Sequence, residues 1–165
     1  MLEVYVLVPV RKSFLTVFVG VLGFVLALMS LLLSCFSMVF AALLVVFGAL
    51  GYWFTFQTNK EFEYSYFDGE VRFAKVINKS RRKRLAVYSM DEVIQIAPSE
   101  DRSVYKYQND NSVKVVDYTS HRKGVPYYVM VLNREGQITL IRFEPDEKYL
   151  EAVMVKYKGK VICRQ

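Results

Sequence analysis

The pattern of apolar and charged positions divides the chain into two parts. Between Lys12 and Lys60 there is no Asp, Glu, Lys, Arg or His, and the stretch from Phe14 to Phe56 is almost continuously apolar. As a single helix this stretch would be about 64 Å long at 1.5 Å per residue, whereas a bilayer core of about 30 Å needs about 20 residues per crossing. The pattern therefore predicts a hairpin of two transmembrane helices over residues 14–56.

The turn of this hairpin is expected at Ser34–Ser37, where two hydroxyl side chains lie close together near the midpoint. A cleaved secretory signal peptide is the alternative, because Arg11 and Lys12 precede the apolar run as cationic residues precede the core of such a peptide. The run is several times longer than the roughly 7 to 15 apolar residues of a signal peptide. We therefore expect a permanent membrane anchor.

Small residues recur along the first predicted helix at spacings of three and four. They are Gly20, Gly23, Ala27, Ser30 and Ser34. This spacing places them on one stripe of a helix, and small side chains let two helix backbones approach closely inside a bilayer. The stripe predicts either close packing of the two helices against each other or docking of a separate membrane protein.

Cationic residues lie at both ends of the apolar stretch, with Arg11 and Lys12 before it and Lys60 after it, and none occurs in the expected turn. Lys and Arg close to the ends of membrane helices favour the cytoplasmic side. Both termini are therefore expected in the cytoplasm. Residues 1–13 would form a cytoplasmic N-terminal segment, and residues 57–165 would form a cytoplasmic domain.

From Glu61 onward the apolar period changes from helical to two. Phe62, Tyr64 and Tyr66 alternate with polar residues, which indicates a half-buried strand, and Asp68-Gly69 is typical of a tight hairpin turn. Further strands are expected at residues 71–77, 85–88, 93–97, 113–118, 127–132 and 138–143, with a polar loop at 98–111.

The chain ends with a helical pattern. Pro145 suits a first helical turn, and Leu150, Val153 and Tyr157 recur at helical spacing. The expected fold of this part is an α+β domain in which about seven antiparallel strands are capped by one C-terminal helix.

Two short stretches carry a resemblance to a known family. They are Phe62-Glu63-Tyr64 followed by Asp68-Gly69-Glu70, and the basic run from Asn78 to Arg84. With these stretches and its layout, the chain resembles an uncharacterised family of small bacterial membrane proteins with two N-terminal membrane helices and a domain like the pleckstrin-homology (PH) superfold. The resemblance implies this architecture in a bacterial cell membrane, and it implies no activity.

Residues 72–84 contain seven Lys and Arg and no acidic residue, so this stretch carries +7, while the whole chain has a net charge of +6. The densest part is Lys79, Arg81, Arg82, Lys83 and Arg84, in an expected connection between two strands. The run could bind anionic lipid, where each cation near the leaflet contributes roughly 1 kcal/mol, or an acidic protein. It could also be a solvated loop that only sets topology. Binding of nucleic acid is disfavoured, because no aromatic residue interrupts the run to stack on bases.

The sequence contains no motif for catalysis, a cofactor or a metal ion. His121 is the only histidine and is expected in an exposed turn. Cys35 and Cys163 are expected to be free thiols, which fits a domain that faces a reducing cytoplasm. The twelve tyrosines lie mostly in or beside predicted strands, where core packing is their expected role.

Three functions remain open from the sequence. The leading hypothesis is a membrane-anchored, non-enzymatic interaction module whose cytoplasmic domain binds a protein or an anionic lipid surface. The second is a small accessory subunit that docks a larger membrane complex through its helical hairpin. The third is a membrane enzyme without a recognisable motif. The basic run favours the first.

Overall fold

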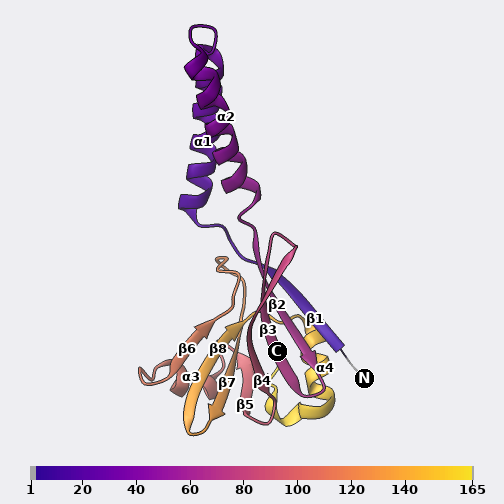
Figure 1. Ribbon diagram of the computed structural model, residues 1–165. Helices are drawn as coiled ribbons and strands as arrows, with labels where there is room; N and C mark the ends of the chain where they lie inside the picture. Colours follow the sequence, from indigo (N-terminus) through magenta and orange to yellow (C-terminus); the bar gives the residue numbers. More distant parts are fainter. Residues whose placement is uncertain (1–2, 165) are drawn as a thin grey trace. The chain divides into compact units, whose positions relative to one another are not determined.

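The computed structural model describes residues 3–164, which divide into two compact units (Figure 1). Residues 11–60 and 77–80 form the first, here called the hairpin unit. Residues 3–10, 61–76 and 81–164 form the second, here called the β domain. The β domain is thus assembled from parts of the chain on both sides of the hairpin.

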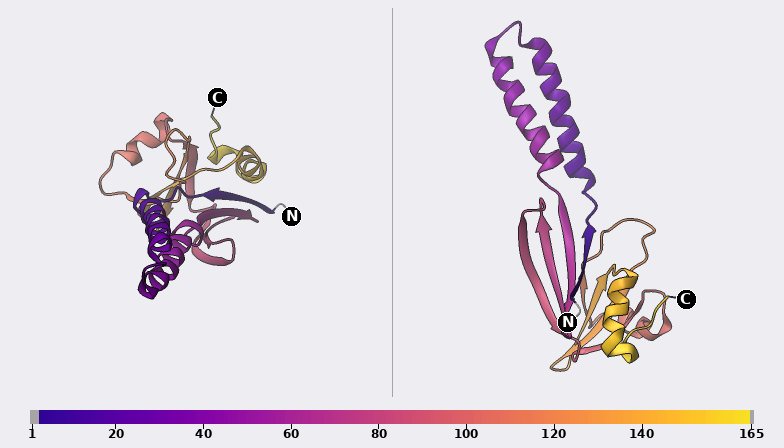
Figure 2. Two further views of the ribbon diagram at one scale, coloured as in Figure 1. Left: turned by 90° about the horizontal axis from the view of Figure 1, so that it is seen from above. Right: turned by 90° about the vertical axis from the view of Figure 1, so that its right-hand side faces the viewer.

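The hairpin unit contains two apolar helices, α1 (Phe14–Leu33) and α2 (Met38–Phe56), which lie side by side (Figure 2). At 20 and 19 residues they are about 30 and 28 Å long, close to the thickness of a bilayer core. Ser37 caps α2 by accepting a hydrogen bond from the backbone N–H of Val39 at 3.3 Å. Both helices are long and apolar enough to cross a membrane, and the turn between them lies where the sequence predicted it.

Small residues allow α1 and α2 to approach closely. Gly20, Gly23, Ala27 and Ser30 are buried in the structure. A Cβ atom added to Gly23 would lie 2.8 Å from the backbone N of Gly51. Most of the small-residue stripe is therefore occupied by the second helix of the same chain, while Ser34 lies beyond α1 and donates to the Leu31 carbonyl at 2.6 Å.

The β domain contains two four-stranded sheets. The first has the order β1 (Glu3–Pro9), β2 (Lys60–Phe67), β3 (Glu70–Ile77) and β4 (Arg81–Ser89). The second has the order β5 (Val93–Pro98), β7 (Tyr128–Arg134), β8 (Gln137–Phe143) and β6 (Lys114–Asp117). Two helices, α3 (Arg102–Gln108) and α4 (Glu147–Tyr157), and a short 3₁₀ turn at Lys158–Lys160 complete the described fold.

The first strand was missed by the sequence analysis, which treated residues 1–13 as a segment outside the domain. Residues 3–9 pair with β2 along their whole length, from Glu3 opposite Phe67 to Pro9 opposite Glu61. Val4, Val6 and Val8 face the core while Tyr5 and Leu7 are exposed, but because all five residues are apolar the sequence shows no period of two. The described domain has eight strands rather than seven, and a strand precedes the hairpin.

Three local expectations were also wrong. The basic run is not confined to a loop, because β4 begins at Arg81 and not near Leu85. The polar segment 98–111 contains α3, which begins where Asp101 accepts a hydrogen bond from the Ser103 backbone at 2.8 Å. The strands are not all antiparallel, since β6 pairs with β8 in parallel.

Tight turns join the hairpins of the domain as the sequence predicted. Asp68 and Gly69 have φ values of 46° and 85°, and Glu135 and Gly136 have φ values of 52° and 85°. Positive φ at both central residues gives a turn whose twist matches that of the strands. The Asp68-Gly69 prediction is therefore confirmed, and Glu135-Gly136 forms a turn of the same kind.

Aromatic rings fill the main core of the β domain. Tyr64 packs edge-on against Phe73 and Phe143, with ring centroids 5.5 and 5.7 Å apart. α4 contributes Tyr149, Leu150 and Val153, all buried. Burial raises the pKa of Tyr64 and Tyr149, so both hydroxyls stay neutral at physiological pH. These tyrosines are packing residues.

The contact at Gly23 generates a stability prediction. Gly23→Ala should push the helices apart, because the new methyl group would meet backbone atoms of Gly51, and such overpacking costs about 1–3 kcal/mol. Gly48→Ala is the matched control, since a Cβ there has no atom within 4 Å. Thermal unfolding in mild detergent, followed by fluorescence of the single tryptophan, Trp53 in α2, should show a lower Tm for the first variant alone. Equal Tm values would contradict the close approach.

Two core tyrosines generate a second prediction. The Tyr149 hydroxyl is buried without a hydrogen-bond partner, whereas the Tyr64 hydroxyl donates to the Tyr118 carbonyl. Tyr149→Phe should leave the free energy of unfolding unchanged or raise it, while Tyr64→Phe should lower it by about 0.5–1.5 kcal/mol. Hydrogen exchange of β-domain amides measures both changes. A larger loss for Tyr149→Phe than for Tyr64→Phe would rule out this assignment.

Candidate functional site

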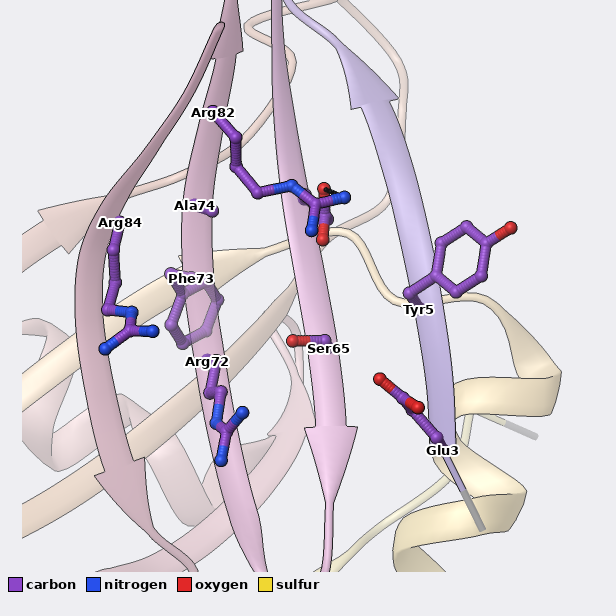
Figure 3. Close-up of a pocket in the computed structure, with 9 residues that line it drawn as sticks. Glu3, Tyr5, Ser65, Arg72, Phe73, Ala74, Arg82 and Arg84 are labelled. Carbon is purple, nitrogen blue, oxygen red and sulfur yellow. Dashed lines mark ion pairs between the residues drawn. The ribbon is translucent and has the colours of Figure 1, made fainter.

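A polar hollow of about 530 Å³ lies on the first sheet, on the face opposite the aromatic core (Figure 3). Each of the strands β1 to β4 contributes to it. Its lining residues are Glu3, Tyr5, Glu63, Ser65, Arg72, Phe73, Ala74, Arg82 and Arg84.

Strand alternation places these side chains together. Along β2, Tyr64 and Tyr66 enter the core, so Glu63 and Ser65 point to the opposite face. The register of β1 on β2 sets Tyr5 directly opposite Ser65. Ser65 and Ala74 are short side chains between long ones, and the space above them is the hollow (Figure 3).

Glu63 and Arg82 form an ion pair inside the hollow. The Glu63 side chain is only 8% exposed, and its Oε2 lies 2.9 Å from Nη2 of Arg82. The Oε2 atom makes no hydrogen bond, so the interaction is electrostatic. A buried carboxylate without a nearby cation costs several kcal/mol. Arg82 therefore has a structural role, because its charge compensates Glu63.

The other two arginines of the hollow, Arg72 and Arg84, are freer than Arg82 to bind an external anion. Arg72 donates from Nε and Nη2 to Oε2 of Glu70 at 3.1 and 2.8 Å, but both side chains are more than 40% exposed, and such surface pairs contribute little. Arg84 has no carboxylate within salt-bridge distance among residues 3–164. Arg72 and Arg84 can therefore bind an added anion without first losing a strong partner.

The structure separates the members of the predicted basic run. Arg82 and Arg84 line the hollow, whereas Arg81 and Lys83 alternate with them and belong to the opposite face of β4. Lys79 lies in the turn between β3 and β4 with φ of 57°.

That turn belongs to the hairpin unit and is tied to the residues that follow α2. The Asn78 backbone N–H donates to the Asn59 carbonyl at 2.9 Å, and its side chain donates to Oε1 of Gln57 at 3.0 Å. Lys79 is therefore held close to the end of α2.

Arg72, Glu63 and Ser65 were missed as site residues by the sequence analysis. They lie outside the segment from Lys79 to Arg84 and carry no motif. The period-two pattern could have placed Glu63 and Ser65 on one face, but the pairing of β3 with β4 was needed to bring Arg72 beside Arg84.

His121 lies in an exposed turn, as expected, with φ of 56°. Its Nδ1 is 3.8 Å from Oδ2 of Asp117 and 3.4 Å from Oγ1 of Thr119. The Thr119 hydroxyl itself donates to Asp117 at 2.7 Å, which makes this group a turn-stabilising arrangement. Within residues 3–164, no three His, Cys, Asp or Glu side chains are grouped as metal ligands.

A second, shallower hollow of about 360 Å³ lies beside the end of β1. Leu7, Val8 and Pro9 form one wall, and Glu144 lies opposite. Glu144 accepts hydrogen bonds from the backbone N–H and the hydroxyl of Ser120, both at 2.9 Å. The polar groups here are used to hold the loop, so the arginine-lined hollow is the better candidate site.

Comparison with known proteins agrees with this architecture. The family model described as bacterial PH-like domain (DUF6106) matches residues 3–163, which includes β1 and nearly all of the chain. No curated protein and no solved structure matches the chain significantly. The resemblance drawn from the sequence is confirmed, and the chain belongs to the DUF6106 family of bacterial PH-like domains.

Proposed function

We propose that this protein is a membrane-anchored, non-enzymatic interaction module. In this proposal α1 and α2 cross the membrane, the PH-like domain stays in the cytoplasm, and the arginines of the first sheet bind an anionic partner.

The pairing of β1 with β2 carries the proposal. Pro9 and Glu61 are partners in the ladder, so the chain leaves the β domain and returns to it at neighbouring positions. Residues 10–60 lie between these positions and contain the two apolar helices. A segment that starts and ends at one place crosses a membrane an even number of times, which supports two crossings.

The distribution of charge supports the cytoplasmic side. Lys12 and Lys60 flank the helices, Lys79 lies next to the end of α2, and the turn at Ser34–Ser37 carries no charge. Cations near membrane ends favour retention in the cytoplasm.

An accessory subunit that docks through its hairpin is the weaker proposal. The stripe of small residues that would carry such docking is largely buried against α2, and the surfaces that remain on both helices are large apolar side chains suited to lipid.

The two native cysteines test the anchor and its orientation. Cys35 is exposed in the turn between the helices, and Cys163 is exposed near the C-terminus. In intact bacterial cells, a membrane-impermeant maleimide should label Cys35 and leave Cys163 unlabelled. Cys35→Ser and Cys163→Ser separate the two signals, and permeabilised cells give the maximum for each. Labelling of Cys163 in intact cells would overturn the proposed orientation.

Photo-crosslinking in living cells tests the interaction. A photoreactive aromatic residue in place of Tyr5, an exposed residue that lines the hollow, should give covalent adducts, because an anionic partner would lie within reach. The same residue in place of the exposed Lys123 is the control and should give none. The adducts should disappear when Arg72 and Arg84 are changed to Glu. A Tyr5 site that forms no adduct contradicts the proposed interaction surface.

A further inference from the structure

The edge of the first sheet offers unpaired backbone groups for binding, in addition to the side chains of the hollow. β4 is the last strand in the order β1-β2-β3-β4, and no other strand pairs with its outer side in the part of the chain that the structure describes. Arg81 to Leu85 are all exposed. An edge strand presents unpaired backbone N–H and C=O groups that can pair with another extended chain.

This edge is cationic on both of its faces. Arg82 and Arg84 point to the face of the hollow, and Arg81 and Lys83 alternate with them. Only Arg82 is compensated, by Glu63. Arg81, Lys83 and Arg84 have no carboxylate within salt-bridge distance among residues 3–164, so three of the four cations in this short stretch of β4 can bind an added anion.

The hollow extends the binding surface on one face. It adjoins β4, and Arg72 from β3 lies beside Arg84 at its rim (Figure 3). Cβ atoms of directly opposite residues on neighbouring antiparallel strands lie about 4.5–5.5 Å apart, so an acidic side chain next to Arg84 is in range of its guanidinium. Arginine binds carboxylates with two parallel hydrogen bonds, which gives direction as well as charge.

These features select among possible partners. A second copy of β4 is disfavoured, because four cations would face four cations. An apolar strand would bury the uncompensated arginines without partners. A bilayer surface would bind the charge but leave the backbone edge unused. An extended acidic segment satisfies both the backbone groups and the side chains.

We propose that β4 is a docking edge for an extended, acidic segment of a partner polypeptide, which adds to the first sheet beside Arg81–Leu85 and places carboxylates next to Arg84, Arg81 and Lys83. This inference rests on the proposed interaction function and specifies its partner. It makes the basic run a strand-pairing surface with selectivity for acidic sequences.

A matched set of peptides tests the inference without altering the protein. The full chain is placed in nanodiscs of neutral phosphatidylcholine, and binding of a fluorescent peptide of repeated Glu-Glu-Thr, which carries carboxylates on both faces when extended, is measured by anisotropy. A second peptide has the same sequence with an N-methyl group on every residue. Its charge is unchanged, but neither edge of its backbone offers N–H groups to β4. That peptide should bind at least tenfold more weakly than the unmodified one.

A matched pair of variants tests the residues. The triple change Arg81→Glu, Lys83→Glu and Arg84→Glu keeps Arg82, and with it the compensation of Glu63, and should abolish binding. The control changes three exposed lysines elsewhere, Lys123→Glu, Lys148→Glu and Lys158→Glu, and should leave the affinity unchanged within about twofold.

Two outcomes would overturn the inference. Equal affinity of the unmodified and the fully N-methylated peptide would mean that charge alone is recognised. Failure of the peptide to bind, together with tight binding of the same nanodisc-embedded protein to phosphatidylglycerol vesicles, would assign the surface to lipid. The maleimide labelling of Cys35 and Cys163 is independent of both outcomes, so loss of the peptide partner would leave the membrane anchor standing.

Discussion

The pairing of β1 with β2 is the interaction on which the rest of the structure depends. It joins residues 3–9 to residues 61–67 across an insertion of about fifty residues, and it buries Val4, Val6 and Val8 against the aromatic core. Without it the first sheet would end at β2, and Tyr64 and Tyr66 would lie on an edge. It also supplies the wall of the hollow that carries Glu3 and Tyr5.

The burial of one charged side chain, Glu63, explains how the candidate site is arranged. Glu63 occupies the outward face of a central strand, where a carboxylate is expected to be solvated, yet it is almost completely covered. Its charge fixes Arg82 above it, and the short side chains Ser65 and Ala74 leave room beside that pair. The ion pair is thus structural, and the neighbouring arginines, which have weaker partners or none, are those with capacity for an external anion.

Features that depend on local sequence were predicted well. The two apolar helices and the Asp68-Gly69 turn follow from composition and backbone preference within a few residues. Features that depend on pairing between distant segments were missed or misplaced. β1 contains only seven residues, and those from Val4 to Val8 are all apolar, so its sequence lacks the alternation that marks a half-buried strand. The start of β4 was hidden because Arg81 to Arg84 have no apolar partner positions, and only the ladder to β3 shows that they are extended.

The order of synthesis also constrains how the split β domain folds. β1 leaves the ribosome first, but its partner β2 follows only after the residues of both apolar helices have been made. Contacts between segments far apart in sequence form slowly, because the intervening chain must first be closed into a loop. Here that loop is the hairpin, so folding of α1 against α2 brings Pro9 and Glu61 together and prepares the ladder. Formation of the hairpin would therefore favour pairing of β1 with β2, and a chain whose hairpin failed to form would leave the first strand without a partner.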